Sequence, residues 1–128
     1  MKSIANHIQT HADALNLRAK RNEILASNIV NAATPNFKAR DIDFSQALQA
    51  RMDVGPVSVS NERHFKFYTG TGDEGAQFRQ SVNPSQDGNT VELHVEQMQF
   101  SENVMRYQTS LEFLNRKFSG LMSAIKGD

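Results

Sequence analysis

The sequence predicts a mainly α-helical chain in which long N- and C-terminal helices pack as an antiparallel coiled-coil hairpin. Each terminal region carries a heptad pattern, and a glycine-rich middle region separates the two. A short third helix and an irregular insert with at most a small β-hairpin complete the expected fold. The predicted parts are 1–34 and 89–128 for the two heptad helices of the core, 35–52 for a pivot loop with the short helix, and 53–88 for the insert.

The N-terminal helix is expected from about Ser3, its N-cap, to Asn31. Alanine recurs every seven residues along it, and other seam residues fall between these alanines in steps of three and four. Such spacing is typical of a heptad seam whose small residues let a second helix approach closely. A plain amphipathic helix would explain the three–four spacing but not the recurrence of alanine at every seventh position. The assigned seam residues are Ala12, Leu15, Ala19, Asn22, Ala26 and Ile29.

A basic cluster of Arg18, Lys20 and Arg21 lies off this seam, on the expected outer face of the helix. Two interpretations remain open for it. The cluster is either a solvated face or a docking surface for acidic patches of a neighbouring subunit.

A pivot motif ends the first helix. Pro35 disfavours the helical conformation for the residue before it, and Asn36 tolerates a left-handed backbone. Asn28 and Asn31 lie on one helical face, where their amides can bond a turning loop or a neighbouring chain, although an ordinary helix end is the alternative. The motif comprises Asn28, Asn31, Thr34, Pro35, Asn36 and Phe37.

A short helix is expected at 43–52, after an extended link at 38–42. Asp43 is its predicted N-cap, with Gln46 as the capping-box partner three residues later. An apolar stripe starting at Phe44 faces the long helices.

The insert is rich in glycine and contains two short runs of alternating apolar and polar residues, 57–60 and 65–68. These runs are candidates for a small hairpin, which would be marginal as two strands alone.

The C-terminal helix is expected to open with a cap pair, Asn89 and Glu92, and to end before a C-cap at Gly127. Gly120 in its interior costs about 1 kcal/mol relative to alanine and marks a position where another backbone can come close. Large residues follow an alternating three–four spacing and suit the alanine-rich face of the first helix. The seam residues here are Val104, Tyr107, Leu111, Leu114, Phe118 and Leu121.

The composition excludes several classes of protein. Lys+Arg and Asp+Glu both number 14, which argues against binding to nucleic acid or to a charged membrane surface. There is no cysteine, and we expect neither a Sec-type signal nor direct membrane insertion, because the first residues lack an apolar core and no long apolar run follows. Only 38% of residues are hydrophobic, so we expect the terminal helices to need partner chains for full burial.

The sequence predicts neither an enzyme nor a cofactor. The glycine pattern at 70–75 matches a nucleotide-binding fingerprint, but its internal acidic residues oppose phosphate. His7 and His11 are spaced to share a metal ion, yet no third ligand is positioned by the sequence, so a surface pair is the expected interpretation. Glu92 and Glu96 are likewise expected on a helix face rather than in a catalytic dyad.

Together, these features resemble the bacterial flagellar rod and hook axial protein family. The resemblance rests on the heptad termini and on the pivot motif, with segments 31–41, 106–108 and 115–121 most similar to proximal rod subunits. Asn36 departs from the glycine that the family usually carries after Thr-Pro, and asparagine is the natural substitute at a left-handed position.

The resemblance implies a non-enzymatic subunit of the proximal rod in the periplasm, at the basal body, exported through the flagellar type III channel without a cleaved Sec signal. It implies helical polymerisation and a set of partners: copies of itself, other proximal rod subunits, a FliE-type adaptor and the export-gate proteins. The pivot motif would set the angle at which the chain leaves the inner layer of the rod. A soluble helical adaptor or secretion chaperone, folded as a closed bundle, is the alternative.

Overall fold

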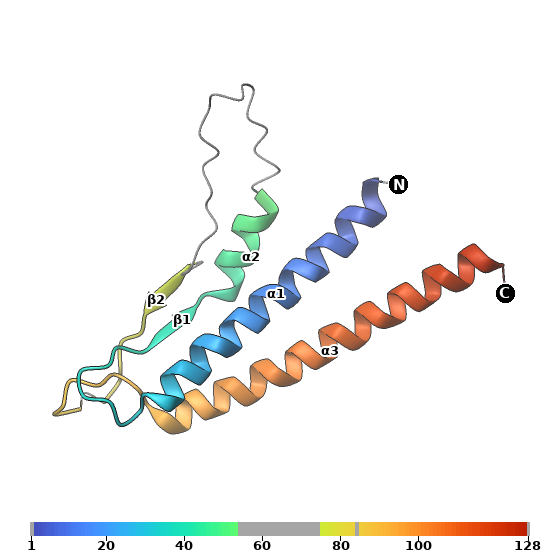
Figure 1. The fold of residues 1–128 in the computed structure, drawn as a ribbon. Coiled ribbons are helices and arrows are strands. Elements are labelled where there is room, and N and C mark those ends of the chain that lie inside the picture. Colours follow the sequence, from blue (N-terminus) through green and yellow to red (C-terminus); the bar gives the residue numbers. More distant parts are fainter. Residues whose placement is uncertain (1, 54–74, 84, 128) are drawn as a thin grey trace, which may run out of the picture.

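The computed structural model describes residues 2–53, 75–83 and 85–127 (Figure 1). The candidate hairpin runs at 57–60 and 65–68, and all but the last residue of the glycine pattern at 70–75, lie outside these residues. The elements in chain order are α1 (Lys2–Val30), β1 (Arg40–Ile42), α2 (Phe44–Asp53), β2 (Ala76–Phe78) and α3 (Leu93–Lys126).

The two long helices form the predicted antiparallel hairpin. With 29 and 34 residues they are about 44 and 51 Å long, at about 1.5 Å per residue. They lie close together where α1 ends and α3 begins, and they diverge toward the two termini (Figure 1). Within the described residues, no helix is long and apolar enough to cross a bilayer.

The small apolar core lies between α1, α2 and the strands. Leu17 and Ile24 of α1 pack with Ile42 of β1, and residues of α2 and Ala76 cover them. The predicted N-cap of α2 is present, because the Asp43 carboxylate accepts hydrogen bonds from the backbone N–H groups of Ser45 and Gln46. The short helix packs against α1.

β1 pairs with β2 in an antiparallel two-stranded sheet, with Arg40 opposite Phe78 and Ile42 opposite Ala76. The sequence predicted an extended link at 38–42 but gave no sign of its partner, because three residues are too few to show an alternating pattern. The insert thus returns a strand to the helix pair.

The start of α3 differs from the prediction. The N-cap position is Glu92, which makes no side-chain capping hydrogen bond in the described chain, and Asn89 does not cap α3. Instead, Asn89 Nδ2 lies 2.9–3.0 Å from the carbonyl oxygens of Asn31, Ala32 and Thr34. These three residues lie in the turn that follows α1, so Asn89 holds the pivot turn rather than the start of α3. The predicted left-handed cap at Gly127 is confirmed, with φ 77°.

Candidate assembly interface

Polar side chains hold α1 against α3 near the pivot. Asn28, Glu96 and Asn103 are each only 1% exposed. Asn28 Nδ2 donates to Glu96 Oε2 at 3.1 Å, and Asn103 Nδ2 donates to Asn22 Oδ1 at 2.8 Å. Buried polar groups are stable only when hydrogen-bonded, so these bonds fix the register of the two helices. We call Asn22, Asn28, Arg79, Glu96 and Asn103 the polar junction.

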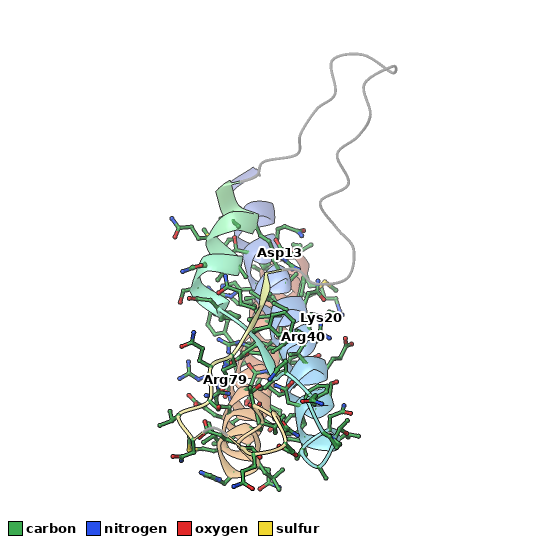
Figure 2. The ribbon with its side chains drawn as sticks, turned by 90° about the vertical axis from the view of Figure 1, so that its left-hand side faces the viewer. Asp13, Lys20, Arg40 and Arg79 are labelled. Carbon is green, nitrogen blue, oxygen red and sulfur yellow. The ribbon has the colours of Figure 1, made fainter. Side chains whose placement is uncertain are left out.

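Arg79 connects the sheet to this junction. It follows β2 directly, and its Nη1 lies 3.0 Å from Glu96 Oε1. Figure 2 views the molecule from the side of the sheet, with Arg40 and Arg79 labelled in front of the long helices. A buried carboxylate is costly without a charged or hydrogen-bonding partner. Glu96 is therefore not on a free helix face, as the sequence had suggested, but is held between α1 and the segment after β2.

The basic cluster is also placed differently from the prediction. Arg21 forms two hydrogen bonds of 2.8 Å with the Asp41 carboxylate, which raise the pKa of Arg21 further above its usual value. Arg18 lies over the Phe44 ring, 4.2 Å from its centre, and burial lowers the pKa of Arg18. Lys20 pairs with Glu23 on its own helix. Arg18 and Arg21 thus bind elements of this chain, and neither the solvated nor the docking interpretation describes them.

The side-chain amides of Asn28 and Asn31 in the pivot motif have different hydrogen-bond partners. Asn28 Nδ2 donates to the Arg40 carbonyl at 2.7 Å, and Asn28 Oδ1 accepts from the Arg40 N–H at 3.1 Å, so the side chain pairs with the returning backbone as a strand would. Asn31 bonds the Ser27 carbonyl of its own helix and accepts from the Thr34 hydroxyl. Pro35 is exposed and Phe37 is half-buried.

The pivot loop closes against the turn before α3. Asn36 has φ 60°, which confirms the left-handed conformation predicted for it, and its N–H donates to the Asp87 carbonyl at 2.9 Å. Gly88 has φ 77°, and a Cβ there would lie 2.6 Å from the end of the Asn36 side chain, so both the backbone conformation and the close approach favour glycine. The Ser85 hydroxyl and the Asn89 N–H both donate to the Asp87 carboxylate and lower its pKa.

The predicted seam residues lie beside the polar junction rather than at its centre. On α1 all six are half-buried, and Asn22 is itself part of the junction. On α3, Val104, Tyr107, Leu114 and Leu121 are half-buried, whereas Leu111 and Phe118 are exposed. The structure shows contacts between the helices at neighbouring positions, such as Arg21 with Gln99 and His11 with Phe113.

The C-terminal half of α3 presents an apolar stripe. At about 100° per residue, its members fall within one sector of about 100°. Leu111, Phe118, Met122 and Ile125 are 39%, 45%, 53% and 80% exposed. Leu114 and Leu121 of the same stripe are half-buried, and the two long helices diverge toward this end (Figure 1). We define the open apolar face as Leu111, Leu114, Phe118, Leu121, Met122 and Ile125.

The sequence did contain a sign of the polar junction. Glu96 and Asn103 are seven residues apart, so α3 carries a polar pair at heptad spacing beside its apolar heptad. The Arg79 contact had no such sign, since it depends on a strand pairing that brings residues close only in the folded chain. Among the described residues, no group of three or more His, Cys, Asp or Glu is arranged to hold a metal ion.

Comparison with known proteins agrees with this architecture. A family model described as flagella basal body rod protein matches residues 8–38, from α1 through the pivot motif. The chain is 52% identical over 128 residues to the flagellar basal body rod protein FlgB of Cereibacter sphaeroides, covering 100% of both chains. It is 47% identical over 121 residues to FlgB of Aeromonas hydrophila, covering 92% of this chain and 91% of that one. It is 38% identical over 122 residues to FlgB of Escherichia coli (strain K12), covering 89% of this chain and 88% of that one.

These relatives are structural rod proteins and not enzymes, which agrees with the resemblance seen in the sequence. The similarity extends over both long helices and the middle region, and it includes the pivot motif. The chain belongs to the FlgB family of flagellar basal body rod proteins.

Proposed function

We propose that this rod subunit polymerises helically through its two long helices. In this proposal the subunit sits in the periplasm as part of the proximal rod, where it links the export-gate proteins and a FliE-type adaptor to the other proximal rod subunits. It reaches that place through the flagellar export channel, without a cleaved Sec signal. The partners and the route come from the resemblance to the rod and hook family, and the contact surface comes from the structure.

One observation carries the proposal, namely that four of the six residues of the open apolar face, Leu111, Phe118, Met122 and Ile125, are exposed in the single chain. Leu114 and Leu121 of this face are half-buried. Burying a large apolar side chain contributes roughly 1.5–3 kcal/mol, so covering several of them is a strong drive to associate. A contiguous apolar patch on a protein surface usually marks an interaction site. The face is too regular to be incidental, because its members keep heptad spacing to the end of the helix.

The alanine-rich side of α1 is a suitable partner for this face in a neighbouring copy. Small residues allow a helix bearing large side chains to come close. When the α3 face of each copy meets the α1 face of the next one head to tail, the contacts are heterologous and can build an open helical assembly. We assign this contact to predicted seam residues outside the polar junction: Ala12, Leu15, Ala19, Ala26 and Ile29 on α1, and Leu111, Leu114, Phe118 and Leu121 on α3. Asn22, which bonds Asn103 of its own chain, stays with Val104 and Tyr107 in the seam between the two helices of one chain.

The pivot motif has a second role in the proposal. Asn28 and Asn31 fix the end of α1, while Thr34, Pro35 and Asn36 are exposed at the turn. We assign to Asn28, Asn31, Thr34 and Pro35 the angle at which the chain leaves the inner layer of the rod.

The experiment compares Phe118→Asp with Ser119→Asp in cells whose own copy of the protein is deleted. Both changes add one carboxylate to exposed positions of α3, but only Phe118 belongs to the open apolar face. Incorporation is measured by quantifying the protein in purified basal bodies, with motility as a second measurement. We expect Phe118→Asp to reduce incorporation by at least about tenfold, because it places a charge in an apolar contact.

Two results would contradict the proposal. One is normal incorporation of Phe118→Asp, and the other is an equal loss in both variants. Thermal unfolding of the purified variants, followed by circular dichroism, checks that Phe118→Asp leaves the single chain folded. A photo-crosslinker at Met122 then tests the partners, since it should form adducts with a second copy or another basal-body protein, whereas one at Glu112 should not.

A further inference from the structure

We propose that His7 and His11 form a chelating site for a divalent transition-metal ion of the Zn²⁺ class. The sequence alone favoured a plain surface pair. The structure adds a geometric fact, which is that the Nε2 atoms of the two rings lie 3.3 Å apart. Both rings belong to α1, one helical turn apart.

This separation fits one edge of a metal coordination sphere. With Zn–N distances of about 2.0–2.1 Å and a tetrahedral angle, two ligating nitrogens lie about 3.3–3.4 Å from each other. Histidines spaced i, i+4 on a helix present their rings to the same point in known zinc sites. The two rings are perpendicular, with centroids 4.6 Å apart, so a rotation of the exposed His7 ring directs both lone pairs at one ion.

One of the two ligands is held in place by the other long helix. The His11 ring packs against Phe113 of α3 at 5.1 Å between centroids, and His11 is half-buried. A ligand that is already ordered loses less conformational entropy when the metal binds. A bound ion would therefore join the N-terminal turns of α1 to a residue already in contact with α3, near the end where the helices diverge.

The donor set determines which ion fits. Imidazole nitrogen suits Zn²⁺, Cu²⁺ and Ni²⁺, whereas Mg²⁺ and Ca²⁺ prefer oxygen. Among the described residues there is no third His, Cys, Asp or Glu grouped with this pair. The remaining coordination positions are thus left to water or to a donor from a neighbouring molecule.

A second explanation of the 3.3 Å distance is a hydrogen bond between two neutral imidazoles, in which one N–H donates to the other ring. Titration calorimetry on the full, untagged chain separates the two. The probe is ZnCl₂ at neutral pH, with MgCl₂ as the control ion. The variants are His7→Gln and His11→Gln, and the matched control is His94→Gln, an exposed histidine on α3.

We expect one Zn²⁺ to bind per wild-type chain and per His94→Gln chain, and no response to Mg²⁺. Each of the other two variants should bind at least about tenfold more weakly, since losing one ligand removes the chelate effect. Zn²⁺ should also raise the melting temperature of the wild type but not of His7→Gln. The site is ruled out if Zn²⁺ gives no heat, or if His7→Gln binds as well as the wild type.

Discussion

The carboxylate of Glu96 in α3 lies 3.0 Å from the guanidinium of Arg79, which directly follows β2. The same carboxylate accepts a hydrogen bond from Asn28 at the end of α1. Glu96 therefore contacts two other segments, the end of α1 and the residue after β2. These two segments are separated in the sequence by β1, α2 and β2. The long helices can bury this charge fully only once the sheet has formed.

Arg79→Met should destabilise the chain strongly, because it leaves the buried Glu96 without its charged partner. We expect a loss of about 3 kcal/mol in the free energy of unfolding, near the lower end for breaking a buried ion pair. Urea unfolding followed by circular dichroism measures it. The double variant Arg79→Met with Glu96→Leu should be more stable than Arg79→Met alone, and a double variant that is less stable would contradict the assigned role of the pair.

Asn28→Ala should cost more than Asn31→Ala, although both residues belong to the pivot motif. Asn28 is buried and bonds both backbone groups of Arg40 and the Glu96 carboxylate, whereas the Asn31 side chain bonds only near its own helix end. We expect a loss of about 2–3 kcal/mol for Asn28→Ala and below about 1 kcal/mol for Asn31→Ala. Equal losses in urea unfolding would show that the pairing of Asn28 with the returning chain contributes little.

Gly88→Ala and Asn36→Gly should interact. In the wild-type background, the methyl group of Gly88→Ala lies close to Asn36 Oδ1, and the alanine must also adopt a left-handed backbone conformation. We therefore expect a loss of about 2 kcal/mol or more in the free energy of unfolding. In the Asn36→Gly background the amide is gone, and only the backbone term of about 1 kcal/mol remains. A double-mutant cycle measures this coupling directly. Strictly additive losses would argue against the close approach of the two loops.

Gly120→Ala should stabilise the single chain. Nothing in the described structure lies within 4 Å of a Cβ built at this position, and the residue lies inside α3. We expect a gain of about 0.5–1 kcal/mol from the higher helix propensity of alanine. Thermal unfolding at 222 nm measures the change, and a lower melting temperature would mean that the end of α3 is not helical in the isolated chain.

Much of this fold follows from local patterns. The end of α1 at Val30 lies one residue from the expected Asn31, and Asn36 and Gly127 adopt the backbone conformations that their residue types indicate. These features depend on neighbours in the sequence, which are visible before folding. The predicted N-cap at Ser3 is wrong, because α1 begins at Lys2 and Ser3 lies inside it. The side of each helix that faces the other was harder to judge, because buried polar residues lie beside the apolar heptads.

The features that were missed depend on contacts between distant segments. Asn89 resembles a helix N-cap in the sequence, yet its side chain bonds three carbonyls of the turn that follows α1. Arg79 and β2 appear as parts of an irregular insert until their pairing with β1 and Glu96 is known. Propensity and periodicity carry no information about contacts between residues that are distant in the sequence, so only the three-dimensional structure reveals them.

The pairing of Ile42 with Ala76 has a practical consequence. The chain leaves the sheet after Ile42 and enters it again at Ala76, and α2, which lies between them in the sequence, packs on the core beside α1. Lengthening the connection between α2 and β2 changes the entropy of loop closure only slowly. A fluorescent or affinity label spliced between α2 and β2 would therefore leave the two long helices undisturbed.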